Sequence, residues 1–246
     1  MSAKIFYPQD KIAIIFSLVI IPLQIYFVSL SVSFPTVLGF ISLIALIFFN
    51  NKFKNRVIKF LRSYIHIPYY GLIFTSFQTY VYKLNPTDYD WLLLKADYTI
   101  FGTDLTKWFE QYISKGLTEV ITLSYFSYYV LPTLTFILLY FSKNSESFIR
   151  TRNYLLSIVI GWYGAFIFYV LLPATGPDIA YPEHYSIPLV GLSPLTNTYL
   201  QNLSEYLKGS FVRNTYPSMH FGILLITNYF AYRYKRKYFW FCTLPL

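Results

Sequence analysis

Six long apolar runs divide this sequence, and they constrain its fold more than any other feature. The runs cover residues 12–32, 34–49, 64–82, 120–141, 154–172 and 216–232. A helix needs about 20 apolar residues, with about 17 as a working minimum, to cross the hydrocarbon core of a membrane. Only 13% of the residues are charged, whereas a soluble domain carries about 25%. We therefore predict an all-α, polytopic membrane helix bundle with about six spanning helices.

The basic residues are distributed unevenly between the loops, and this asymmetry predicts the orientation of the chain. With the N-terminus in the cytoplasm, fourteen of the 20 Lys and Arg residues fall in cytoplasmic segments, together with only two of the 11 acids, Asp10 and Glu146. Cytoplasmic loops of membrane proteins carry such an excess of Lys and Arg. The formal charge of +9 is thus explained by topology, and we predict no nucleic-acid partner.

The two ends of the sequence leave alternatives open. Ser29, Ser31 and Ser33 form a weak small-residue cleavage pattern, so the first run is either a removed signal peptide or an uncleaved anchor. We favour the anchor because the run is long and leads directly into the second run. At the other end, residues 238–246 begin an apolar run that stops after nine residues. We therefore expect the chain to be cut inside a helix.

The two long extracytoplasmic segments differ in composition. Residues 83–119 mix Trp, Tyr and aliphatic side chains with scattered charges, which is typical of short helices that lie along the membrane interface. Residues 173–213 are dense in Pro, Gly, Asn and Ser, which predicts irregular structure. Neither segment has the composition of a soluble domain, so we treat 1–246 as a single integral membrane domain. Because the chain has one cysteine, Cys242, and three histidines, we predict no disulfide, no metal and no cofactor.

The segment 213–222 leads into the sixth run at its extracytoplasmic end and holds the strongest candidate site. It reads Arg-Asn-Thr-Tyr-Pro-Ser-Met-His-Phe-Gly. Proline is favoured in the first turn of a helix, Thr215 or a neighbour can cap that helix, and the free N–H groups of the first turn suit a phosphate. Ser218 supplies a hydroxyl donor, Arg213 a guanidinium, and His220 an imidazolium that can protonate a leaving oxygen. The alternative is that His220 and Arg213 are ordinary polar residues at a membrane interface.

These motifs resemble a known family. The Pro-Ser-x-His motif at 217–220 resembles the second signature of the type 2 phosphatidic acid phosphatase superfamily. Residues 173–182, Pro-Ala-Thr-Gly-Pro-Asp-Ile-Ala-Tyr-Pro, are similar to the branch that includes inositol-phosphorylceramide synthases, in which a Gly-Pro is followed by an aromatic residue and Pro. Residues 97–104 and 125–132 also have the spacing of that branch. The resemblance covers about residues 60–235.

The resemblance implies a mechanism and roles for three residues. In this superfamily a histidine of a third signature, His-x-x-x-Asp, attacks phosphorus, and the histidine of the second signature protonates the leaving alcohol. By resemblance, His220 is the general acid, and Ser218 and Arg213 bind phosphate. The implied partners are a lipid phosphate and, for the inositol-phosphorylceramide branch, a polyol acceptor such as inositol.

Two signatures of that superfamily are missing from the sequence. The first, a Lys and an Arg-Pro several residues apart, is not visible, although the inositol-phosphorylceramide branch also departs from it. No His-x-x-x-Asp follows residue 220. Either a following segment supplies the nucleophile, or the chain is a naturally truncated member without activity.

The long loop before the signature offers further candidates for substrate binding. Gly176, Pro177 and Asp178 resemble the family's Gly-Pro segment, and His184 lies in the same loop. His184 is also a substitute nucleophile if Glu183 orients it, although an ordinary exposed loop histidine is the simpler interpretation.

Three other titratable residues have both a functional and a structural interpretation. Asp97 and Asp104 flank a Phe-Gly turn and can hold a polyol, or a phosphate through a divalent ion; the alternative is that they are solvent-facing charges and helix caps. His66 stands at the cytoplasmic start of the third run, and we interpret it as an interfacial residue.

Three functional hypotheses follow. The first is a membrane lipid-phosphate phosphatase or phosphotransferase with its site on the extracytoplasmic side, similar to inositol-phosphorylceramide synthases. The second is a non-catalytic, lipid-binding, truncated family member. The third is a small transporter, which is disfavoured because the apolar runs hold acidic residues only at their ends, whereas coupling-ion sites lie near the midplane. The sequence indicates no oligomeric state.

Overall fold

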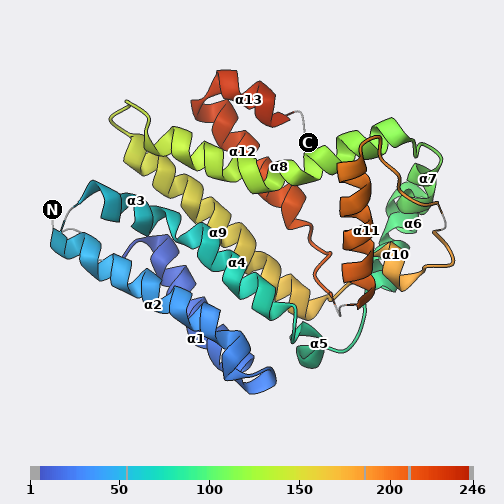
Figure 1. Ribbon diagram of the computed structural model, residues 1–246, viewed down its shortest axis with the longest axis horizontal. Coiled ribbons are helices and arrows are strands. Elements are labelled where there is room, and N and C mark those ends of the chain that lie inside the picture. Colours follow the sequence, from blue (N-terminus) through green and yellow to red (C-terminus); the bar gives the residue numbers. More distant parts are fainter. Residues whose placement is uncertain (1–5, 54, 186, 210–211, 244–246) are drawn as a thin grey trace. The chain divides into compact units, whose positions relative to one another are not determined.

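The computed structural model confirms the predicted all-α class. It has 77% of its residues in helices, and no strand occurs among the residues that it describes, which are 6–53, 55–185, 187–209 and 212–243. The helices in Figure 1 are α1 (Pro8–Phe27), α2 (Leu30–Phe53), α3 (Arg56–Tyr64), α4 (His66–Phe77), α5 (Val81–Leu84), α6 (Asp90–Phe101), α7 (Leu105–Glu110), α8 (Lys115–Tyr140), α9 (Ser147–Leu171), α10 (Pro177–Ala180), α11 (Pro194–Gly209), α12 (Met219–Tyr234) and α13 (Arg236–Thr243).

Four helices, α1, α2, α8 and α9, are long and apolar enough to cross a membrane. The other two predicted spans contain shorter helices. The run 64–82 is divided between α4, with 12 residues, and α5, with four, while α12 has 16 residues. The structure therefore supports a helical membrane bundle, and the number of six spans stays a prediction.

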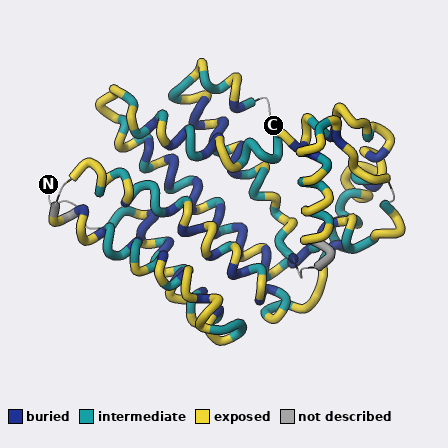
Figure 2. The backbone as a smooth tube through the Cα atoms, viewed as in Figure 1, coloured by how far each residue is buried: buried dark blue, intermediate teal, exposed yellow. Residues whose placement is uncertain are grey.

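One compact unit combines α1 to α5 with residues 136–167. Within it, α2 packs against α1, α3 and α4, and Figure 2 shows buried positions recurring along these helices between exposed ones. Polar side chains join the helices, since the hydroxyls of Ser17 and Tyr69 lie 2.6 Å apart. The ring of Tyr70 stacks on that of Trp162 with centroids 4.0 Å apart. Small hydroxyls and stacked rings of this kind hold helices together where apolar side chains face lipid.

The turn between the first two helices lies earlier than the sequence indicated. The boundary between the runs 12–32 and 34–49 predicts a turn at Ser33, but α1 ends at Phe27 and α2 begins at Leu30, so Ser33 and Pro35 are inside α2. Ser29 explains the early start. Its hydroxyl accepts a hydrogen bond from the N–H of Val32 at 3.4 Å, which caps the first turn of α2 before Pro35 is reached.

A buried ion-pair cluster fixes the start of α1 in this unit. A carboxylate oxygen of Asp10 lies 2.7 Å from the guanidinium of Arg62, and the other lies 3.0 Å from Nε2 of His66. All three side chains are buried, and the guanidinium lies over the ring of Tyr7, 4.1 Å from its centroid. The imidazole of His66 is thus buried beside Asp10, and its interpretation as an interfacial residue stays a prediction.

The second compact unit contains residues 85–135 and continues from residue 168. In it, the predicted short extracytoplasmic helices appear as α6 and α7, which pack on each other and expose the rings of Trp91, Trp108 and Phe109. Helix α12 packs against α13. Helix α11 contacts α8 through the rings of Tyr199 and Phe126, whose centroids lie 4.5 Å apart. This unit carries the Pro-Ser-x-His segment.

Candidate functional site

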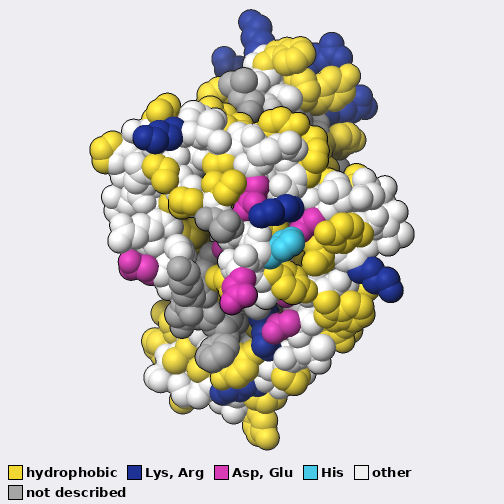
Figure 3. All heavy atoms as spheres, turned by 90° about the vertical axis from the view of Figure 1, so that its right-hand side faces the viewer, with side chains coloured by type: hydrophobic (Ala, Val, Ile, Leu, Met, Phe, Trp, Pro, Cys, Tyr) yellow, Lys and Arg dark blue, Asp and Glu magenta, His cyan; other side chains and the backbone are white. Residues whose placement is uncertain are grey.

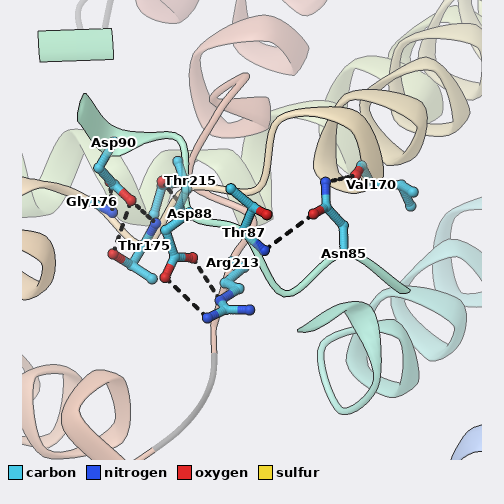
Figure 4. Close-up of polar contacts among 10 residues, drawn as sticks. Asn85, Thr87, Asp88, Asp90, Val170, Thr175, Gly176, Arg213 and Thr215 are labelled. Atoms are coloured by element: carbon cyan, nitrogen blue, oxygen red, sulfur yellow. Dashed lines mark hydrogen bonds and ion pairs between the residues drawn. The ribbon is translucent and has the colours of Figure 1, made fainter. Parts of the chain in front are cut away.

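Three segments that are distant in the sequence are joined by hydrogen bonds around a buried carboxylate (Figure 4). One oxygen of Asp90 accepts from the N–H of Gly176 at 2.8 Å, and the other accepts from the N–H and hydroxyl of Thr175 at 3.0 and 3.2 Å. The carbonyl of Ala174 accepts in turn from the N–H and hydroxyl of Thr215. The Gly-Pro segment is thereby fixed to the segment that leads to the Pro-Ser-x-His signature.

Arg213 is held by the carboxylate of Asp88, which lies two residues before Asp90. Its Nε lies 2.7 Å from one oxygen of Asp88, and its Nη2 lies 3.0 Å from the other. This two-point contact orients the guanidinium plane. The segment 85–90 is anchored by Asn85, whose side-chain amide donates to the carbonyl of Val170 at 2.9 Å.

Asp88 and Asp90 were not among the residues predicted from the sequence. The available signal was the presence of two acids where the non-helical segment 85–89 leads into α6.

Helix α12 begins at Met219, after the proline that was expected in its first turn. Ser218 is the N-cap residue, and its hydroxyl oxygen accepts from the N–H of Phe221 at 3.5 Å. Pro217 therefore precedes the helix and does not occupy its first turn, because a serine side chain closes the turn where we expected the proline ring. The carbonyl of Pro217 accepts from the hydroxyl of Tyr169 at 3.2 Å.

His220 lies in the first turn of α12, between aromatic rings of α8. Its ring stacks on Tyr125 with centroids 3.9 Å apart and an interplanar angle of 23°, and the ring of Tyr128 is 4.4 Å away. Nε2 of His220 is buried and has no hydrogen-bond partner among the described residues. Buried polar atoms nearly always have a partner. The rings therefore fix the imidazole, while one of its nitrogens has no partner among the residues that the structure describes.

His184 belongs to a different cluster. Its Nε2 lies 3.3 Å from a carboxylate oxygen of buried Asp104, whereas no ion pair joins it to Glu183 in the described part of the chain. Asp104 is also the N-cap residue of α7, as the helix-cap interpretation predicted, and accepts from the N–H of Lys107. Burial raises the pKa of Asp104, but hydrogen bonds from Tyr185 and the backbone outweigh it, so that pKa lies below its usual value. On the face shown in Figure 3, acidic and basic side chains gather around a histidine.

The Gly-Pro segment has a structural role at its glycine. Gly176 has φ +99°, and a Cβ there would lie 3.3 Å from a carboxylate oxygen of Asp178, so only glycine fits without strain. Pro177 and Asp178 are exposed, and their assignment to substrate binding stays a prediction. No group of three or more His, Cys, Asp or Glu side chains in the described ranges is placed to hold a metal ion.

Comparison with known proteins places the chain in one family. No curated protein and no solved structure matches the sequence. A family model described as the PAP2 superfamily matches residues 93–246, which is more than half of the chain and includes α7, α10 and α12 and most of α6. The chain therefore belongs to the PAP2 superfamily, and this membership supports a phosphatase-like function on lipid phosphates in general.

Proposed function

We propose that this protein is an integral membrane lipid-phosphate phosphatase or phosphotransferase with its site on the extracytoplasmic side. The observation that carries the proposal is the buried Nε2 of His220, which has no partner among the described residues and stands in the first turn of a 16-residue helix. A helix N-terminus favours a phosphate. A histidine in that turn is within reach of the oxygen that leaves the phosphorus.

The reaction proceeds in two steps in this proposal. A histidine nitrogen attacks phosphorus, the bond from phosphorus to the lipid oxygen breaks, and His220 gives its proton to that oxygen. Water, or the hydroxyl of an acceptor, then gives its proton to His220 and attacks phosphorus, and the phosphorus–nitrogen bond breaks so that the attacking histidine is released. No His-x-x-x-Asp occurs in residues 221–246, so the proposal assigns the attacking histidine to none of the residues described above.

The phosphate oxygens are bound by two donors of the segment 213–222. The hydroxyl of Ser218 accepts from Phe221, so its own proton is available to a phosphate oxygen. The guanidinium of Arg213, oriented by Asp88, carries five N–H donors and binds the phosphate of the substrate. Gly176, Pro177, Asp178 and His184 are proposed to contact the rest of the substrate.

The finer identity rests on the Gly-Pro segment. Its likeness to inositol-phosphorylceramide synthases supports a phosphorylated headgroup as the transferred group and a polyol such as inositol among the ligands. Water and an acceptor alcohol require the same general acid, so hydrolysis and transfer use His220 in the same way.

A reconstitution assay tests the proposal. Full-length protein is placed in phosphatidylcholine vesicles that contain phosphatidate, and released phosphate is measured with and without inositol. We expect phosphate release, a radiolabelled enzyme intermediate that is labile to acid, and competition by the polyol if transfer occurs. If phosphatidate and phosphatidylinositol bind but are neither hydrolysed nor exchanged, the non-catalytic lipid-binding alternative is correct.

Replacing Arg213 by Ala is expected to weaken substrate binding more than turnover. A hydrogen bond to a charged group contributes about 1.5–3 kcal/mol, so the KM for phosphatidate should rise by about 10- to 100-fold. Arg213→Lys should restore only part of the affinity, because an ammonium cannot make the two parallel bonds of a guanidinium. Steady-state kinetics give KM and kcat separately. An unchanged KM in Arg213→Ala contradicts the assignment of this residue.

A further inference from the structure

One extracytoplasmic stretch lacks charge altogether. Residues 184–204 contain no Asp, Glu, Lys or Arg, although a water-facing stretch of that length carries about five such residues. Five of its aliphatic side chains are between 40% and 73% exposed: Ile187, Leu189, Val190, Leu192 and Leu195. Pro188, Gly191 and Pro194 interrupt the stretch and exclude a spanning helix. An uncharged loop that exposes aliphatic side chains suits an apolar partner.

Glu119 of α8 fixes the position of this loop. One oxygen of its carboxylate accepts from the N–H groups of Leu192 and Ser193 at 2.8 and 3.1 Å, and the other accepts from the hydroxyls of Ser193 and Thr196 at 2.7 and 2.9 Å. A Cβ on Gly191 would lie 2.7 Å from the same carboxylate. The loop therefore packs directly against the beginning of α8.

The position of Glu119 along α8 gives the depth of the loop. The apolar run 120–141 begins at the next residue, and its 22 residues rise about 33 Å as a helix, close to the ~30 Å of a hydrocarbon core. Glu119 then stands at the outer boundary of that core. The backbone of residues 192–193, which donates to its carboxylate, lies at the same boundary.

We propose that residues 187–195 form a lipid-contact loop, whose aliphatic side chains insert into the outer leaflet and touch phospholipid acyl chains. Burying a leucine side chain contributes about 1.5–3 kcal/mol. The lack of charge over 184–204 removes the desolvation cost that a Lys or Asp would impose at this depth.

Helix α11, which follows the lipid-contact loop, and the Pro-Ser-x-His site both contact Tyr125 of α8. Tyr125 of α8 lies 6.2 Å from Tyr199 of α11 and 3.9 Å from His220, measured between ring centroids. If the proposed function holds, a lipid phosphate whose chains remain in the outer leaflet beside the loop presents its headgroup at the level of His220. This last step rests on the proposed function, whereas the membrane contact of the loop does not.

Site-directed spin labelling measures the depth directly. In a full-length background in which Cys242 and every cysteine outside the 246 residues are replaced by Ala, a nitroxide is attached to Leu192→Cys and, separately, to Leu195→Cys. Both positions are exposed, so labelling does not disturb the packing. The matched control is Glu205→Cys, an exposed charged position on α11. The protein is reconstituted in phosphatidylcholine vesicles in which a quarter of the lipid is phosphatidylglycerol.

We expect the ratio of collision rates with oxygen to those with a water-soluble nickel chelate to be several-fold higher at residues 192 and 195 than at 205. Equal ratios at all three positions overturn the proposal, because the loop then lies in water. Protection of residues 192 and 195 from both reagents also overturns it, because another protein surface then covers the loop. Phosphate release is not measured here, so a failure of the proposed function leaves the result on the loop unaffected.

Discussion

Replacement of His220 by Ala is expected to lower phosphate release from phosphatidate by about 100- to 10,000-fold, the usual contribution of a general acid. Without the imidazole, the lipid oxygen has no positioned proton donor and leaves as an unprotonated alkoxide. His220→Gln should lose a similar factor, because an amide fills the same space and forms hydrogen bonds but does not release a proton at neutral pH.

The measurement is initial-rate phosphate release by the full-length protein in vesicles, with insertion checked by resistance to carbonate extraction. Leu225→Ala is the matched control, because Leu225 is an exposed residue of the same helix and takes no part in the proposed site. We expect it to release phosphate at the wild-type rate. Wild-type activity in His220→Ala would remove His220 from the reaction.

Much of the fold could be predicted because membrane insertion depends on local features of the sequence. Apolar runs and charge asymmetry depend only on neighbouring residues, so hydropathy located α1, α2, α8 and α9. Helix boundaries depended on finer chemistry. The hydroxyl of Ser29 starts α2 ahead of Pro35, and a broken stretch separates α4 from α5; neither feature changes the mean hydropathy of a window.

The candidate site could be predicted only where it is local. The Pro-Ser-x-His motif is contiguous in the sequence, so Ser218 and His220 could be selected as candidates from their spacing. Asp90 meets Thr175 across 85 positions, and Asp88 meets Arg213 across 125. Contacts that distant require the folded chain, because many acids in a sequence can pair with one arginine and the pattern does not select among them.

The cluster of Asp10, Arg62 and His66 could not be predicted either, because Asp10 is distant in the sequence from its two partners. Removal of the Asp10 carboxylate has the second large effect that we predict. Asp10→Ala should lower the free energy of unfolding by about 3–5 kcal/mol, the cost of leaving a buried charge without its counter-charge. The guanidinium of Arg62 lies 2.7 Å from the carboxylate and its side chain is 2% exposed. Water therefore cannot replace the missing carboxylate.

Unfolding in mixed micelles with increasing dodecyl sulfate measures this difference, and Lys11→Ala is the matched control, because Lys11 is the exposed charged neighbour of Asp10 on α1. We expect Lys11→Ala to change the free energy of unfolding by less than about 0.5 kcal/mol, as surface substitutions do. The triple variant Asp10→Leu, Arg62→Met, His66→Leu should recover most of the loss, because it removes both charges of the buried ion pair together. A loss in Asp10→Ala no larger than in Lys11→Ala would show that the start of α1 is held by its apolar contacts and not by the ion pairs.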